Sequence, residues 1–232
     1  MIKNICIIPA RGGSKRIPNK NIINLNGKPM IAYTIEAAIA SKLFERIIVS
    51  TDNKRIAKIS KQYGAEVPFL REAYSDDYSP VSMATLNTLK QAKKYYNEKY
   101  DNVIQLFATC PLRNSDHIIS AYKNFKDKGN TFQISAFKLG WMNPWWAIKI
   151  NENGEPEQLF VKELKSRSQD LPDLYSPTGA VWIANAEAFE KEKTFYGKDY
   201  RLYELNWMNA VDVDDNDDLN MVKVILGFNE ER

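Results

Sequence analysis

The 232-residue sequence predicts an α/β fold, in which helices cover both faces of a mostly parallel β-sheet. Two observations predict this class. Short apolar segments of the kind that form buried strands alternate with longer segments that carry an apolar face at helical spacing. Such alternation gives parallel strands joined by helices that pack on the sheet. The length of the chain and its hydrophobic content of 44% suffice for one well-buried domain.

In the amino-terminal half, residues at the helix boundaries support the assignment. Pro29 precedes the first helix, where its fixed φ angle favours the first turn. Gly64 follows the second helix and suits a left-handed residue at a helix end. The strands are apolar runs, and the first two end in polar loops. We expect strands at residues 5–9, 46–50, 65–70 and 102–107, and helices at residues 30–40, 54–63 and 82–96.

In the other half, the alternation is interrupted once. Residues 138–178 are rich in aromatic side chains and contain an Asn153-Gly154 turn typical of a hairpin. We therefore expect a single domain, residues 1–232, with an excursion at 138–178. The remaining expected elements are a helix at 115–126, a strand at 132–137, hairpin strands at 147–150 and 158–161, a strand at 180–184, a helix at 185–191, a strand at 210–213 and a helix from about 217.

Composition argues against several function classes. A formal net charge of +3 gives no general affinity for nucleic acid, and no apolar segment approaches membrane-spanning length. Cys6 and Cys110 lie in apolar strand contexts and no signal peptide is recognised, so a reduced cytoplasmic protein without nucleic-acid or membrane partners is expected. A single histidine, His117, disfavours His-dependent triads and His-rich metal sites.

The loop after the first strand is a predicted anion site. The first 35 residues contain six Lys or Arg residues and no Asp or Glu. Gly12 and Gly13 permit close approach of backbone N–H groups, and several fixed cations suit a nucleoside triphosphate. The spacing matches neither a P-loop nor a G-x-G-x-x-G dinucleotide motif. A solvated basic turn is the alternative, but no local acid pairs with its cations, which are Arg11, Lys15, Arg16 and Lys20.

An acidic segment near the carboxyl terminus complements this loop. Asp212 and Asp214 belong to a predicted strand end, where residues i and i+2 point the same way, so both carboxylates can reach one hard cation. Helix capping by Asp214, Asp215 or Asp217 is the alternative, and it is expected of one of them. Ligands of such sheets bind outside the carboxyl ends of the strands, which is where both segments are expected.

Residues 8–21 resemble the signature of the acylneuraminate cytidylyltransferase, or CMP-sialic acid synthetase, family. The resemblance implies a Rossmann-like three-layer α/β/α nucleotidyltransferase with a small dimerisation excursion. It also implies transfer of CMP from CTP to the anomeric hydroxyl of a nine-carbon α-keto sugar acid, with Mg²⁺ as cofactor and pyrophosphate as product. Further segments that match are Gly27-Lys28-Pro29-Met30, Ser50-Thr51-Asp52, Arg71 with Asp76-Asp77, Thr109-Cys110-Pro111-Leu112-Arg113, Arg167-Ser168-Gln169-Asp170-Leu171-Pro172 and Asp212-Val213-Asp214.

The resemblance implies roles for individual residues. Asp212 and Asp214 are the expected Mg²⁺ ligands. The expected catalytic residues are Arg11, Lys15, Lys20 and Asp214. The expected nucleotide contacts are Ala10, Arg11, Gly12, Gly13, Ser14, Lys15, Lys20, Asn21 and Arg71. The expected sugar contacts are Phe107, Thr109, Arg167, Gln169, Thr178 and Gly179.

Trp141, Trp145 and Trp146 resemble part of the family's dimerisation excursion. Three Trp residues within six positions are hard to bury in a small arm without a partner surface, so we expect a homodimer. A local aromatic core is the alternative. Arg167 has two interpretations: a bidentate contact with the sugar carboxylate, or an ordinary charge on the surface.

Two departures from the family pattern leave the sugar open. Phe107 stands where sialic-acid members usually have Gln, and Thr178 where they usually have Asn. An aromatic residue at the first position resembles pseudaminate-type enzymes. Those enzymes usually have His-Asp-Ala-Gly where this chain has Ser176-Pro177-Thr178-Gly179. The candidates are N-acetylneuraminate, legionaminate, pseudaminate or another 3-deoxy-nonulosonate. A CMP-Kdo-type synthetase, a non-catalytic nucleotide-binding homologue and nucleic-acid binding through the loop are the alternatives.

Overall fold

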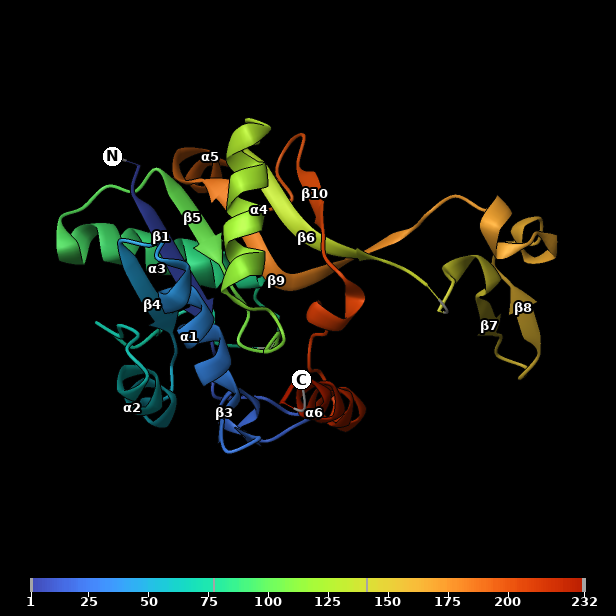
Figure 1. Cartoon of the computed structure of the whole chain (residues 1–232), viewed down its shortest axis with the longest axis horizontal. Coiled ribbons are helices and arrows are strands. Elements are labelled where there is room, and N and C mark those ends of the chain that lie inside the picture. The colour runs from blue at the N-terminus through green and yellow to red at the C-terminus, as the bar shows by residue number, and fades with distance from the viewer. Residues whose placement is uncertain (1, 77, 141, 231–232) are drawn as a thin grey trace.

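A computed structural model describes residues 2–76, 78–140 and 142–230. Its centre is a six-stranded sheet in the order β10-β6-β9-β5-β1-β4, with helices on both faces (Figure 1). Five strands run in one direction, because β1 is parallel to β4 and β5, and β10 is parallel to β6. Only β9 runs antiparallel, between β5 and β6. The predicted mostly parallel α/β class is therefore confirmed.

The strands of this sheet are short, except for β9. They are β1 (Asn4–Pro9), β4 (Arg46–Ser50), β5 (Asn102–Gln105), β6 (Phe132–Lys138), β9 (Tyr175–Asn185) and β10 (Arg201–Glu204). The helices are α1 (Met30–Ser41), α2 (Lys54–Gln62), α3 (Val81–Tyr96), α4 (Ser115–Asp127), α5 (Ala186–Glu192) and α6 (Asn216–Glu230). A two-stranded ribbon of β2 (Asn24–Leu25) and β3 (Lys28–Pro29) precedes α1.

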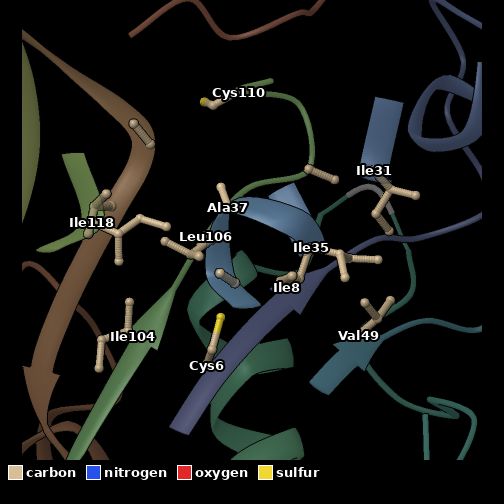
Figure 2. Packing of buried hydrophobic residues seen from close by; sticks show 14 of the residues in the cluster. Cys6, Ile8, Ile31, Ile35, Ala37, Val49, Ile104, Leu106, Cys110 and Ile118 are labelled. Atoms are coloured by element: carbon tan, nitrogen blue, oxygen red, sulfur yellow. The ribbon is translucent and has the colours of Figure 1, made fainter. Parts of the chain in front are cut away.

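The central strand β1 is buried on both faces, because its side chains alternate between two apolar cores. Cys6 and Ile8 pack with residues of α1, α2 and α4, as Figure 2 shows for part of this cluster. Ile5 and Ile7 pack with α3 and α5 on the other face. A third, smaller cluster holds α6 against the segment before α1. The last helix is thereby placed beside the loop that follows β1.

Two predicted strands are wrong, and one strand of the central sheet was not predicted, nor were the two-residue strands β2 and β3. Residues 65–70 form only an isolated bridge between Glu66 and Ile48, and Pro68 has no N–H with which to continue a ladder. Residues 210–213 are irregular and contribute one backbone hydrogen bond to the neighbouring loop, from Val213 N to Thr109 O at 2.8 Å. The unpredicted strand β10 is an exposed edge with a polar-rich sequence, which gives little strand signal.

Between β6 and β9, residues 139–140 and 142–174 extend away from the sheet as an arm, whereas Lys138 and residues 175–178, at the ends of the predicted excursion, still belong to β6 and β9 (Figure 1). Its far end is an antiparallel hairpin of β7 (Ile148–Ile150) and β8 (Pro156–Gln158), with Gly154 at a φ of 83° in the turn. The predicted hairpin is confirmed, although its second strand begins earlier than expected. No helix in the described ranges has both the length and the apolar character needed to cross a membrane.

Candidate functional site

One pocket, of about 550 Å³, opens at the carboxyl ends of β1 and β5. Lys15 and Asp214, from opposite ends of the chain, both line it. The sheet topology explains this meeting, because parallel strands bring their following loops to one edge. Ten of the predicted site residues line this pocket, namely Arg11, Ser14, Lys15, Lys20, Asn21, Arg71, Phe107, Thr109, Asp212 and Asp214.

Hydrogen bonds to the loop after β4 hold the basic loop in place. Gly12 N donates to Asp52 Oδ1 at 2.8 Å, and Ala10 N donates to Ser50 O at 2.9 Å. A Cβ atom at Gly12 would lie 2.8 Å from the side-chain nitrogen of Asn53, so a larger residue would displace the side chain that caps α2. Three predicted nucleotide contacts in this loop are not part of the pocket lining, namely Ala10, Gly12 and Gly13.

Two arginines mark the side of the pocket near residues 71–80. Arg11 donates from Nη1 to Asp76 O at 3.0 Å. Arg71 is 6% exposed, and its Nε has no hydrogen-bond partner in the described part of the protein. Burial lowers the pKa of Arg71, while the charge of Asp52 acts in the opposite direction. A buried, unsatisfied guanidinium N–H at a pocket wall is suited to an acceptor on a ligand.

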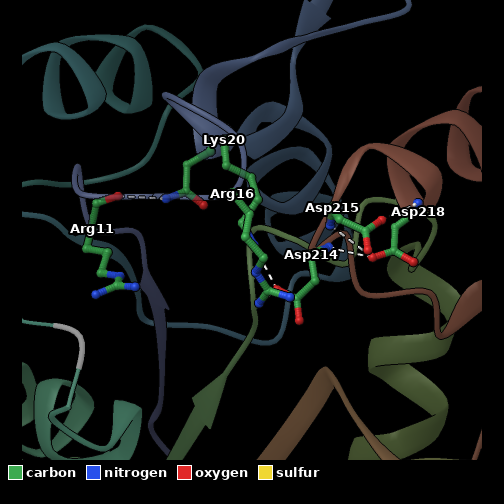
Figure 3. Close-up of polar contacts among 7 residues, drawn as sticks. Arg11, Arg16, Lys20, Asp214, Asp215 and Asp218 are labelled. Carbon is green, nitrogen blue, oxygen red and sulfur yellow. Dashed lines mark hydrogen bonds and ion pairs between the residues drawn. The ribbon is translucent and has the colours of Figure 1, made fainter. Parts of the chain in front are cut away.

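On the opposite side, Asp214 accepts two cations on one oxygen. Lys20 Nζ lies 2.9 Å from Asp214 Oδ1, and Arg16 Nη2 lies 3.0 Å from the same atom (Figure 3). Partial burial acts to raise the pKa of Asp214, but Lys20 and then Arg16 outweigh it, so the pKa lies below its ordinary value. Asp214 is therefore ionised at neutral pH.

Asp212 lies deeper than Asp214. Burial raises the pKa of Asp212, and the charge of Asp214 raises it further, while a hydrogen bond from the Thr109 hydroxyl lowers it. Both carboxylates line the same pocket. A cation bound beside Asp212 and Asp214 would favour the ionised form of both carboxylates.

The other acids of this segment are used by the last helix. Asp215 Oδ1 accepts hydrogen bonds from the backbone N–H groups of Asp217 and Asp218, at 2.9 and 3.1 Å. Asp218 Oδ2 accepts from Asp214 N and Asp215 N, at 2.8 and 3.1 Å. Asp215 is thus the capping residue, as expected for one aspartate of the segment. The carboxylates of Asp212 and Asp214 are left to the pocket.

Phe107 and Thr109 form another part of the wall. The Phe107 ring lies 5.2 Å from that of Trp182, and a Cβ atom at Gly179 would overlap it. Gly179 therefore lies behind Phe107 rather than in the lining. Thr178 is also buried, and its hydroxyl donates to Ala210 O at 2.6 Å, so it supports the segment that carries Asp212.

Arg167 and Gln169 lie on the arm and not in this pocket. Arg167 Nε pairs with Asp170 at 2.8 Å, and Gln169 lines a separate hollow at the base of the arm. Trp145 packs edge-to-face on Phe160 at 5.1 Å and donates to Pro172 O, which makes it part of a local aromatic core. Trp141 lies outside the described residues.

Several lining residues were not among the predicted contacts. Arg16 was recognised as a cation but given no role. Tyr74, Asp76 and Ser79 follow Arg71, and the Asp76 motif was the only signal for that segment. Val81 and Ala84 belong to the first turns of α3, where a pocket-facing side chain has the same pattern as a core-facing one.

The donor set suits a hard divalent cation that also binds substrate. Mg²⁺ sites commonly use one or two carboxylates and complete the shell with phosphate oxygens and water. Asp212 and Asp214 provide such a pair in the pocket. Among the described residues, no group of three or more His, Cys, Asp or Glu side chains is arranged to hold a metal without substrate.

Two solved structures share this fold. CMP-2-keto-3-deoxy-manno-octonic acid synthetase in complex with CTP matches with a TM-score of 0.71, covering 98% of this chain and 99% of that chain at 15% identity. A 4-diphosphocytidyl-2C-methyl-D-erythritol synthase from Anaerococcus prevotii matches with a TM-score of 0.67, covering 97% of this chain and 99% of that one at 12% identity. At these identities the likeness concerns the fold.

The sequence comparisons are more specific. The profile of the cytidylyltransferase family matches residues 5–205, and the chain belongs to this family. It is 37% identical to the pseudaminic acid cytidylyltransferase of Campylobacter jejuni over 231 residues, which are 99% of both chains. It is 35% identical to the CMP-N,N'-diacetyllegionaminic acid synthase of Legionella pneumophila over 233 residues, which are 98% of this chain and 97% of that one. The predicted family is therefore confirmed.

Proposed function

We propose that this enzyme transfers CMP from CTP to the anomeric hydroxyl of a nonulosonic acid of the pseudaminic, legionaminic or sialic type. The anomeric oxygen forms a bond to the α-phosphorus, the bond from that phosphorus to the bridging oxygen breaks, and pyrophosphate leaves. The observation that carries the proposal is the pocket in which the cationic loop faces Asp212 and Asp214. The names of the two relatives reported above support the choice of CTP and of a nonulosonic acid as substrates.

The residues of the basic loop would align and neutralise the triphosphate. In-line displacement at phosphorus needs positioning and charge stabilisation more than covalent help. Arg11, Lys15 and Lys20 line the pocket, and their charges would stabilise the leaving pyrophosphate. Arg71 would use its unsatisfied N–H on the nucleotide, and Asn21, whose Nδ2 donates to Arg11 O at 2.9 Å, would hold the loop.

Asp212 and Asp214 would hold Mg²⁺. A bound Mg²⁺ ion would supply charge neutralisation at the phosphate oxygens and polarise the α-phosphate. The two carboxylates are suited to this by their position at the wall of the pocket that the cations also line. No described histidine lines the pocket, so the proton of the sugar hydroxyl would pass to a carboxylate such as Asp214, to the substrate itself or to a hydroxide held by the metal.

We propose that the arm forms a homodimer and completes the sugar site. Ile148, Ile150, Leu159 and Val161 are each more than 50% exposed on the arm, which a partner surface would cover. Arg167 and Gln169 lie on the arm, outside the pocket of their own protomer. Dimerisation would have to bring them to the pocket of the other copy. A cytoplasmic location, and the absence of nucleic-acid and membrane partners, stay predictions.

The test is pyrophosphate release with CTP, Mg²⁺ and a panel of sugar acids. We expect release only when CTP and a nonulosonic acid are both present, and loss of release on chelation of the metal. The panel should contain pseudaminic, legionaminic and N-acetylneuraminic acids, with the eight-carbon Kdo as the alternative substrate. Release with Kdo alone would favour the CMP-Kdo-type activity. CTP binding without turnover of any sugar acid would favour a non-catalytic homologue.

A further inference from the structure

Arg16 is the cation of the basic loop for which neither the family resemblance nor the proposed function has a role. It lies on the pocket wall, and its side chain is 64% exposed. Its guanidinium contacts the same Asp214 oxygen as the ammonium of Lys20, which is only 14% exposed (Figure 3). The proposed Mg²⁺ ligand is therefore already neutralised by two cations of the protein itself.

This arrangement opposes the binding of a metal to that oxygen. Two positive groups at about 3 Å from Asp214 Oδ1 would repel a divalent ion placed there. The same two cations are also the pocket groups nearest to Asp214 that can bind phosphate. Arginine matches phosphate oxygens with two parallel hydrogen bonds, so a triphosphate competes well for Arg16.

We propose that Arg16 is a further functional residue, which together with Lys20 exchanges Asp214 for the triphosphate when CTP enters the pocket. The exchange frees the carboxylate of Asp214 for Mg²⁺. Arg16 is suited to it because an exposed ion pair contributes only about 0–1 kcal/mol and is easily broken. This inference rests on the proposed function, since it assigns Mg²⁺ and CTP to the same pocket.

The exchange has a signature of opposite signs. Without Arg16, Asp214 loses a competitor for the metal, so the metal alone should bind more tightly. Without Arg16, the triphosphate loses a donor, so CTP alone should bind more weakly. A residue that merely supports the structure would weaken both. The two binding steps must be measured separately, because CTP itself binds divalent cations in solution.

The experiment compares the wild type, Arg16→Gln and Lys149→Gln as full-length proteins. Mn²⁺ binding is followed by electron paramagnetic resonance without nucleotide, and CTP binding by calorimetry in the presence of a chelator. For Arg16→Gln we expect Mn²⁺ affinity to rise and CTP affinity to fall, each about two- to fivefold. Lys149 pairs with Glu157 at 2.9 Å on the arm and is 55% exposed, so its variant removes a comparable charge and should change neither.

The variant Asp214→Asn is an independent test, because it leaves Arg16 in place. It should lose the tighter part of Mn²⁺ binding and bind CTP more tightly without metal, since both cations are released. Unchanged constants in Arg16→Gln, a fall in both, or weaker CTP binding in Asp214→Asn would overturn the exchange. If the wild type binds Mn²⁺ and CTP but the variants do not show these changes, the exchange is refuted and the proposed function stands. A wild type that binds no CTP would overturn both.

Discussion

The guanidinium of Arg113 donates a hydrogen bond of 2.8 Å to the hydroxyl of Thr34, which joins the loop after β5 to helix α1. The same side chain donates to Phe107 O at 3.1 Å and to Ala180 O at 2.9 Å. Arg113 is 1% exposed, and all of these acceptors are uncharged. One buried cation thus holds the segment that presents Phe107 and Thr109 to the pocket.

Arg113→Met is expected to lower the free energy of unfolding by about 3 kcal/mol. The substitution removes the side-chain donor to Ala180 O and one donor to Phe107 O, which still accepts from the Thr34 hydroxyl at 3.2 Å. A buried group left unsatisfied costs about 1–3 kcal/mol. Urea denaturation measures the change. Arg167→Met is the control, because that side chain is 76% exposed and its pair with Asp170 contributes at most about 1 kcal/mol. Equal losses in both variants would contradict the role of Arg113.

Gly179→Ala is expected to impair use of the sugar acid as well as stability. Its new Cβ overlaps the Phe107 ring, and overpacking of this kind costs about 1–3 kcal/mol. The displaced ring should raise the KM for the sugar acid while the KM for CTP changes less. Gly197→Ala is the matched control, since its Cβ overlaps the Phe132 ring away from the pocket lining. That variant should lose stability with unchanged KM values, and a raised sugar KM there would refute the interpretation.

Asp215→Ala and Asp212→Asn are expected to have opposite consequences. Loss of the Asp215 cap should lower the free energy of unfolding by about 1 kcal/mol and leave pyrophosphate release intact. Asp212→Asn removes a proposed metal ligand worth several kcal/mol in the transition state, so release should slow by about 100-fold or more in a folded protein. Thermal unfolding and the pyrophosphate assay are run on both. A fully active Asp212→Asn enzyme would exclude Asp212 from the metal site.

Acid sensitivity is expected from the pair of Arg46 and Glu98. The hydrogen bond from Arg46, with a second from Tyr100, lowers the pKa of Glu98 from 4.5 to about 2. Because the folded-state pKa is the lower one, the pair stabilises the protein above about pH 4.5, and this contribution is lost as the pH falls toward 2. The difference in urea midpoint between the wild type and Glu98→Gln should therefore shrink across this window. A difference that stays constant would contradict the lowered pKa.

Charge on the arm is expected to dissociate the proposed homodimer. Ile150 and Val161 are 67% and 57% exposed, and lysine at both positions would place unpaired charge in an apolar interface. Analytical ultracentrifugation should show a monomer for the double variant, with CTP binding retained. Val224→Lys, on an exposed position of α6, controls for added charge on another surface. A wild-type chain that sediments as a monomer would refute the assignment.

The sequence predicted the elements whose signal is local. Continuous apolar runs identified β1 and β4, and helical periodicity with suitable terminal residues identified α1 and α2. It failed at residues 65–70 and 210–213, because an apolar pattern does not say whether a neighbouring strand is available for pairing. The prediction also missed β10, because its polar side chains are as typical of a loop as of an exposed edge strand.

The sequence by itself determined the family, the parallel α/β class and the basic loop that lines the pocket, because each depends on residues that are near one another in the chain. Only the tertiary structure decided which aspartate caps α6, where Arg167 lies, and that Lys20 meets Asp214 from 194 residues away. Such pairings depend on the order of strands in the sheet and on which charges are buried together. These quantities follow from packing of the whole chain, so no local pattern reports them.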